Sequence, residues 1–405
     1  MNTSLFTEAK IGSVLLRNRS IRAAAFEGMC PGNKVSDDLI RYHTAVSAGG
    51  IGMTTVAYAS VSRSGLSFPH QLLLNREAIP ELQRLTGSIH GEGAAASIQI
   101  GHCGQMANTK ISGICFAPTG GFNLYGPTLP KTMSLKEIRE TVIDFGKAVQ
   151  IAIDSGFDAV EVHAGHGYLI SQFLSPFTNK RKDEYGGIFE NRCRFMIEVI
   201  REVIKTAGQK IAVIVKMNLR DGFRGGMELD EAIKVAKTLE NEGVHALVLS
   251  GGFVSKAPMY VMRGAMPIGI MAHGMKNFWM RAGTGLFGKY LMKPMNFTEG
   301  YFMEDALKAR ASVKIPLVFV GGVKSLKTIE DVLNKGFDFI QIARALIHDP
   351  AFINKLKSGE LSQSGCMTSN YCIARMYSGR MCCFQSDDNT PVKWANEFGL
   401  KRNGS

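Results

Sequence analysis

Short apolar runs alternate with longer amphipathic stretches along most of the chain. Eight of these runs are rich in Val, Ile and Ala, which is typical of strands buried on both faces. The predicted strands span Ser20–Ala25, Gly52–Ala57, Ala95–Ile100, Ala159–His163, Ile211–Met217, Ala246–Leu249, Leu317–Val320 and Phe339–Ala343.

The stretches between these runs carry apolar residues at helical spacing. Several end in glycine, as at Gly156 and Gly243, and Ser134 followed by Glu137 has the form of a capping box. The predicted helices span Asp37–Ala48, Ile79–Glu92, Leu135–Ser155, Asn191–Ala207, Leu229–Glu242, Met303–Ala311, Ser325–Asn334 and Ala351–Lys357.

Eight strands, each followed by a helix, predict an α/β protein with a (β/α)8 TIM barrel. We expect the barrel to occupy residues 1–358. Residues 359–405 form a tail that is too short for a further domain.

One long segment, residues 251–301, interrupts the alternation between the sixth strand and the sixth helix. It is rich in methionine and aromatic residues, has basic residues interleaved, and shows no readable regular pattern. Loops of this length are usually functional or disordered. We expect either a lid over an apolar substrate or a surface-binding segment, or else a subdomain or oligomer contact with its own small core.

Composition narrows the class of protein. Apolar residues make up 45% and charged residues 20%, as in globular proteins. The net charge of +12 is spread along the chain without a basic block, so we expect an anionic small ligand and no nucleic acid. There is no membrane-spanning run and no signal-like N-terminus, which favours a cytoplasmic protein.

Candidate chemistry lies at the strand ends, where barrels place their active sites. His163, His166 and Tyr168 follow the fourth strand. Two imidazoles can donate to a carbonyl oxygen, and a phenol can donate a proton. A metal site of Glu161, His163 and His166 is weaker, because only Glu161 and His163 share a strand face.

The third and fifth strands each contribute one inward polar candidate. The Gln99 amide can both donate and accept, which suits the edge of a heterocyclic ring. Lys216 would be costly to bury without a negative partner, and a reduced flavin, anionic near its N1, would be such a partner.

The seventh and eighth strands end in a pattern suited to phosphate. Gly321 and Gly322 can present backbone N–H groups, and Arg344 can pair with phosphate oxygens in forked geometry. The loops after these two strands often bind phosphate in barrels.

These residues resemble the old yellow enzyme family of flavin-dependent ene-reductases. The most specific match runs from Glu161 to Pro176, continues through Asn179–Gly187 and ends at Glu190–Arg192. Leu16–Arg19, Gln99, Gly321-Gly322 and Ala343–Leu346 match in the same order, so the resemblance covers nearly the whole chain to about Cys383.

The resemblance implies a barrel that holds FMN without a covalent bond. Gln99 and Lys216 would contact the pyrimidine end of the flavin, Ala57 would line its ring, and Ala23, Ala24 and Ala25 would pass beside it. The phosphate would lie against Gly321, Gly322, Val323, Ala343 and Arg344.

The implied reaction is a ping-pong reduction of an activated alkene, with NADH or NADPH as hydride donor. His163 and His166 would bind the carbonyl oxygen, and Tyr168 would protonate the neighbouring carbon.

Two features depart from the family pattern. Relatives often carry a Thr or Cys that bonds the flavin after the first strand, where this chain has Ala23-Ala24-Ala25. Larger relatives bind an iron–sulfur cluster through a CxxC pair and two later cysteines. Here Ser369 replaces the second cysteine between Cys366 and Cys372, with Cys382 and Cys383 following. We therefore expect free thiols and no [4Fe–4S] cluster or other metal.

Other functions stay open at this stage. A flavin-dependent dehydrogenase of an amine or saturated ketone would use the same barrel. A non-catalytic flavin- or lipid-binding protein would dock through the Met-rich segment on a membrane or partner. A redox- or metal-sensing tail is a fourth reading. The expected partner is a small-molecule substrate, and a homo-oligomer is compatible with the sequence.

Overall fold

The eight predicted strands close into a parallel barrel. A computed structural model describes residues 4–123, 128–275, 277–377 and 380–384. Around the barrel the strands follow the order β10-β11-β12-β3-β4-β5-β8-β9. Their bounds are Ser20–Arg22 (β3), Met53–Ser60 (β4), Ala95–Gly101 (β5), Ala159–Ala164 (β8), Ala212–Asn218 (β9), Ala246–Ser250 (β10), Leu317–Val320 (β11) and Phe339–Ile342 (β12).

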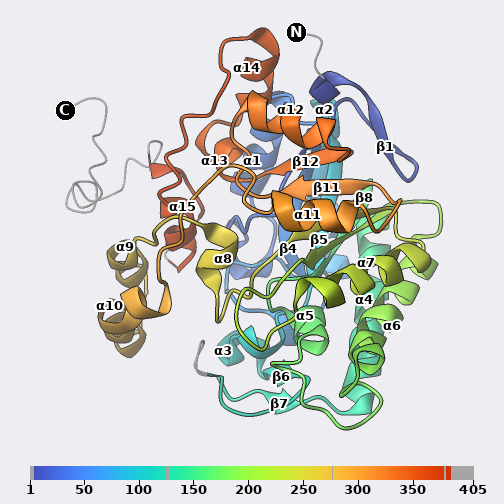
Figure 1. Ribbon diagram of the computed structural model, residues 1–405, viewed down its shortest axis with the longest axis vertical. Coiled ribbons are helices and arrows are strands. Elements are labelled where there is room, and N and C mark those ends of the chain that lie inside the picture. Colours follow the sequence, from blue (N-terminus) through green and yellow to red (C-terminus); the bar gives the residue numbers. More distant parts are fainter. Residues whose placement is uncertain (1–3, 124–127, 276, 378–379, 385–405) are drawn as a thin grey trace.

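Helices surround the barrel, and the eight predicted ones are present (Figure 1). The capping box of the third predicted helix is confirmed, because the Ser134 hydroxyl accepts from the Glu137 backbone N–H and the Glu137 carboxylate accepts from Ser134. The helices that match are Asp37–Ala48 (α1), Ile79–Gly91 (α2), Leu135–Asp154 (α4), Phe189–Ala207 (α6), Leu229–Asn241 (α7), Met303–Arg310 (α11), Leu326–Asn334 (α12) and Phe352–Ser358 (α14).

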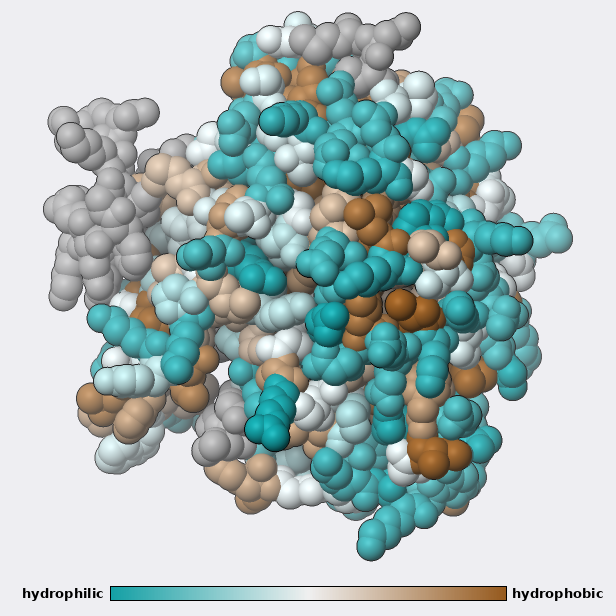
Figure 2. Space-filling model, viewed as in Figure 1, coloured by the Kyte–Doolittle hydropathy of each residue, from teal (hydrophilic) through white to brown (hydrophobic). Residues whose placement is uncertain are grey.

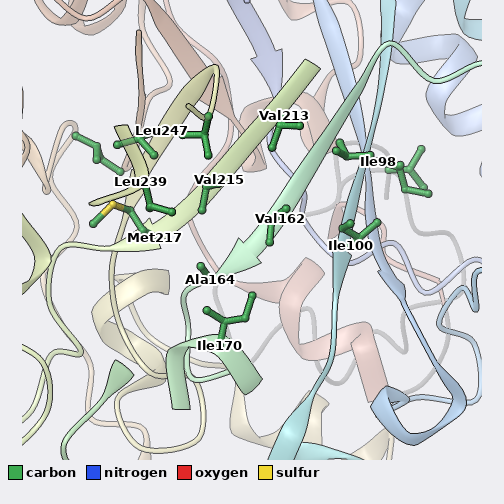
Figure 3. Packing of buried hydrophobic residues seen from close by; sticks show 14 of the residues in the cluster. Ile98, Ile100, Val162, Ala164, Ile170, Val213, Val215, Met217, Leu239 and Leu247 are labelled. Carbon is green, nitrogen blue, oxygen red and sulfur yellow. The ribbon is translucent and has the colours of Figure 1, made fainter. Parts of the chain in front are cut away.

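Side chains alternate between two cores because successive strand residues point to opposite faces. On β8, Val160 and Val162 face outward and pack under the helices. Val162 lies near Val213, Val215 and Ile98 of neighbouring strands (Figure 3). Inward-facing Ala159, Ile214 and Phe339 fill the barrel interior.

The inward face changes character toward the carboxyl ends of the strands. One step beyond the apolar layer of Ala159, Ile214 and Phe339 stand Glu161, Lys216 and Gln341. All three are buried. A buried polar layer therefore follows the apolar layer toward the carboxyl ends of the strands, and the polar candidate residues gather at that end of the barrel.

Several short elements were not predicted. An N-terminal hairpin packs Ile11 and Leu16 against the inward-facing apolar residues near the beginning of the barrel strands. The unpredicted strands are Ala9–Ile11 (β1), Val14–Leu16 (β2), Phe116–Ala117 (β6) and Lys131–Thr132 (β7), and the unpredicted short helices are Thr109–Ser112 (α3), Leu169–Leu174 (α5), Arg344–His348 (α13) and Tyr371–Ala374 (α15).

The first barrel strand is shorter than predicted. It ends at Arg22, because Ala25 N–H turns back to the Ala23 carbonyl at 2.7 Å. Ala23 N–H still donates to the Ile342 carbonyl of β12 at 2.9 Å, but Ala24 and Ala25 leave the sheet. All three border the cavity described below.

We predicted no regular pattern for the Met-rich segment, residues 251–301, and this prediction is wrong. It contains three helices, Pro258–Met262 (α8), Ile268–His273 (α9) and Phe278–Leu291 (α10). Its Met259 and Met266 form a small core with Tyr371 of the tail helix α15. The periodicity is hidden because apolar residues occupy both faces of α10.

No described helix is both long and apolar enough to cross a bilayer. The part of the predicted tail beyond Phe384 lies outside the described residues.

Candidate functional site

A cavity of about 240 Å³ opens at the carboxyl ends of the strands. Most of the predicted site residues border it. They are Ala23, Ala24, Ala25, His166, Tyr168, Lys216, Gly322, Val323, Ala343 and Arg344. Four predicted residues, His163, Ala57, Gln99 and Gly321, are not among the cavity-lining residues.

Glu161 organises the floor of the site. One carboxylate oxygen accepts from Gln99 Nε2 at 2.6 Å and lies 2.8 Å from Lys216 Nζ. The other oxygen accepts from Gln341 Nε2 at 2.6 Å. The strand register explains the Gln99–Glu161 hydrogen bond, because Gln99 on β5 pairs with Glu161 on β8. The negative partner that Lys216 needs is therefore already supplied by the protein, contrary to our expectation that a flavin would provide it.

One buried polar atom on this floor has no partner among the described residues. Gln341 Oε1 is buried and accepts no hydrogen bond, while its amide nitrogen is held by Glu161. Gln341 also borders the cavity. Leaving a buried acceptor unsatisfied is costly, so this oxygen favours a ligand that presents an N–H at this position.

The other end of the cavity is cationic. Arg344 and Lys324 both border it, and Arg344 is held by Asn370, to which its guanidinium donates at 2.8 Å. Gly322 has φ of +74°, and a Cβ there would lie 2.9 Å from the Thr298 carbonyl oxygen. Glycine thus leaves backbone exposed beside two cations, an arrangement suited to an anionic group.

The loop after β8 carries the catalytic candidates in an unusual backbone conformation. His166 has φ of +58°, which costs a non-glycine residue energy, and residues in such conformations cluster at active sites and ligand clamps. Its Nε2 lies 2.7 Å from the Ser250 hydroxyl, and its backbone N–H donates to the Asn218 side chain. The imidazole is therefore fixed from two neighbouring strands.

The three predicted catalytic residues form one aromatic group. The ring of His163 stands edge-on to His166 at 5.0 Å between centroids and to Tyr168 at 4.6 Å. Tyr58 lies 5.0 Å from Tyr168 on the side of the small core that also contains Ala57. Tyr168 and His166 reach the cavity, and His163 lies behind them with a buried Nδ1 that has no hydrogen-bond partner in the described part of the chain.

Both imidazoles are held in the neutral form. Burial, with the nearby Lys216 adding to the effect, lowers the pKa of His166 to about 3. Burial also lowers the pKa of His163 well below its usual value, with His166 and Lys216 adding to the effect. A neutral imidazole can donate one hydrogen bond without bringing a positive charge.

Ala57 contributes through its backbone. Its N–H donates to the carboxylate of buried Glu27, which also pairs with Arg22 at 2.6 Å. The Ala57 side chain packs in the cluster with Tyr58 and Tyr168. It lies next to the cavity wall without forming it.

The tail cysteines lie near the cationic end. Cys366 and Cys372 border the cavity, and Cys383 Sγ is 3.5 Å from His348 Nδ1. All eight cysteines are free thiols, and burial raises the pKa of Cys372 to about 12. Across the described ranges, no three His, Cys, Asp or Glu side chains converge as metal ligands do.

Sequence reasoning missed four residues of the site. Glu161 was considered only as a weak metal ligand, and Gln341, Ser250 and Lys324 were not considered. Gln341 and Glu161 share a signal, since each is a polar residue at an inward position of an otherwise apolar strand. Ser250 and Lys324 carry no comparable signal.

Comparison with known proteins identifies the group to which this architecture belongs. A family model described as NADH:flavin oxidoreductase / NADH oxidase matches residues 4–285. The 4,4'-dithiodibutanoate disulfide reductase of Rhodococcus erythropolis is 39% identical over 381 residues, which is 94% of each chain. The NADH oxidase of Thermoanaerobacter brockii is 29% identical, and the alignment covers 96% of this chain and 58% of that protein.

Solved structures agree on the fold. A 2-naphthoyl-CoA reductase complex superposes with a TM-score of 0.80 at 24% identity, over 96% of this chain and 58% of that one. An old yellow enzyme homologue from Zymomonas mobilis superposes with a TM-score of 0.72 at 22% identity, over 97% and 99% of the two chains.

Proposed function

The chain belongs to the NADH:flavin oxidoreductase / NADH oxidase family, which includes the old yellow enzymes, and we propose that it reduces activated carbon–carbon double bonds. It is a flavin oxidoreductase that uses FMN with NADH or NADPH. The substrate class and the residue roles below are proposals.

Both ends of the cavity carry groups that support binding of FMN. The Gln341 Oε1 atom, which has no partner among the described residues, suits the pyrimidine N–H of a flavin. The carboxylate of Glu161, which holds Gln341, also holds Gln99 and Lys216. Arg344, Gly322 and Val323, together with Lys324, would hold the phosphate. When bound, FMN supplies hydride transfer from the nicotinamide to the substrate.

The observation that carries the proposal is that neutral His166 and the Tyr168 phenol border the same cavity, next to buried His163. A carbonyl oxygen that accepts from the neutral His166 imidazole is stabilised as enolate-like charge develops on it, because that hydrogen bond strengthens. Tyr168 then donates its proton to the carbon next to the carbonyl group.

The experiment is an anaerobic cycle with the purified holoenzyme. NADH or NADPH should bleach the visible flavin absorbance, and an unsaturated ketone such as 2-cyclohexenone should restore it with formation of the saturated ketone. A flavin that is bleached but is not reoxidised by any activated alkene would contradict the proposed substrate class.

A second candidate is reduction of an organic disulfide, favoured by the 39% identical relative that carries this activity in its name. Two electrons and two protons would split one S–S bond into two thiols. Adding 4,4'-dithiodibutanoate to the same reduced enzyme tests it, with the thiol product followed by mass spectrometry. Reoxidation by the disulfide but not by the enone would select this candidate.

A further inference from the structure

Helix α10 exposes an unusual amount of apolar surface. Of the fourteen large hydrophobic side chains that are exposed within the described ranges, seven lie on this one helix. Trp279 is 80% exposed and Tyr290 is 74% exposed. Contiguous apolar surface of this kind usually marks an interaction site. The seven are Phe278, Trp279, Met280, Leu286, Phe287, Tyr290 and Leu291.

The exposed face is set by how α10 packs. Gly288 allows close approach to α9, since a Cβ there would lie 2.9 Å from Ile268, and the Thr284 hydroxyl contacts Met275 Sδ at 3.3 Å. Trp279, Leu286 and Tyr290 are seven and four residues apart, so they share one side of the helix, away from Gly288.

The helix also stands clear of the barrel. α9 and α10 project together at the left of Figure 1. In Figure 2, hydrophobic residues gather at the lower left, over the same elements. A flat surface could therefore reach α10 without meeting the barrel helices.

The charged residues of the segment that carries this face are of one sign. From Gly251 to Thr298 the sequence has six basic residues and no acidic one. Among them, Arg281, Lys289 and Lys293 are exposed on α10 or directly after it. A second copy meeting this face would bring like charges together, whereas an anionic surface would be attracted.

We propose that α10 is an interfacial anchor that docks this enzyme on an anionic lipid bilayer. Trp279, Phe287 and Tyr290 lie on one side of α10, with Lys289 at the edge of that side. Trp, Tyr, Phe and Lys are residue types that lie at the boundary between headgroups and acyl chains. At fourteen residues the helix is about 21 Å long, so it lies in the interface and does not cross it. This inference is independent of which substrate the cavity takes.

The test is co-sedimentation of the holoenzyme with sucrose-loaded vesicles. Vesicles of 70% phosphatidylcholine and 30% phosphatidylglycerol should bind the protein, while pure phosphatidylcholine should bind it more weakly. The double variant Trp279→Ser/Phe287→Ser should lower the partition coefficient roughly tenfold or more. High salt should weaken binding of the wild type, because it screens the basic residues.

A matched control removes exposed apolar side chains elsewhere. Leu15→Ser/Ile188→Ser changes two residues that are 52% and 63% exposed on other elements, and it should bind vesicles as the wild type does. Flavin content and circular dichroism establish that each variant is folded. In a Trp394→Phe background, Trp279 emission should shift to the blue with anionic vesicles.

Three outcomes would overturn the proposal. The wild type could fail to bind anionic vesicles. The α10 variant could bind them as well as the control does. Sedimentation equilibrium could show a wild-type dimer that the α10 variant converts to a monomer without vesicle binding, which would make a second copy the occupant.

Discussion

Gln341 on β12 donates to Glu161 on β8 at 2.6 Å, across the barrel interior. The two residues are 180 positions apart in sequence. Three strands lie between β12 and β8 in either direction around the closed barrel, so the two strands face each other across it. With Lys216 at 2.8 Å on the other oxygen, the carboxylate ties two sides of the barrel together below the cavity. This bond also turns Gln341 so that its free oxygen stays available to a ligand.

Replacing the carboxylate should expose the cost of burying Lys216. Glu161→Gln keeps the shape but leaves a buried ammonium without its anion, so we expect the apoprotein to lose about 3–5 kcal/mol of stability. Urea unfolding measures this free energy. Adding Lys216→Met to Glu161→Gln should recover part of the loss, and equal stability of the single and double variants would contradict the pairing.

Removing the phenol should separate the two half-reactions. Tyr168→Phe should leave flavin reduction by NADPH unchanged, because that step needs no proton from Tyr168. Alkene reduction should slow on the order of 10²–10⁴-fold, as measured by anaerobic stopped-flow absorbance.

Tyr58→Phe is the matched control, because the Tyr58 ring packs on Tyr168 but its hydroxyl bonds Ser67 at 2.6 Å. It should leave both half-reactions near wild type. If Tyr168→Phe slowed both half-reactions alike, the phenol would not be the specific proton donor.

The cationic end should recognise phosphate. Arg344→Met should raise the dissociation constant of FMN about 10–100-fold, the size expected for a lost charge-assisted hydrogen bond. Riboflavin lacks the phosphate, so its affinity should change little. Fluorescence titration of the apoprotein measures both dissociation constants, and Arg139→Met, at an exposed residue of α4, is the control. Equal weakening of the two flavins would place the phosphate elsewhere.

Neutral His166 should make stability depend on pH in a defined window. Its folded pKa of about 3 lies below the ordinary value of 6.5, so the unfolded chain binds the extra proton between them. This contribution is full above about pH 6.5 and is lost as the pH falls toward 3.

The measurement is urea unfolding of the apoprotein at pH 7 and pH 5. Over that interval His166→Asn should lose roughly 1–2 kcal/mol less stability than the wild type. His163 titrates in the same direction, so the variant should keep part of the pH dependence. An identical pH dependence in wild type and variant would rule out the assigned pKa.

The sequence by itself determined the barrel and most of the candidate site. Alternating runs predicted all eight strands and their helices, because strands covered on both faces must be apolar and the helices between them amphipathic. The predicted strand ends also indicated Tyr168, His166, Lys216 and Arg344 as site residues, because a parallel barrel brings the carboxyl ends of its strands to one edge, and all four border the cavity.

Only the tertiary structure decided which side chains meet. That Glu161 joins Gln99, Lys216 and Gln341 depends on barrel closure, which local periodicity does not encode. The exposure of α10 was hidden for the same reason. Its apolar residues resemble core in sequence, and only the packing of Gly288 on α9 determines which side remains uncovered.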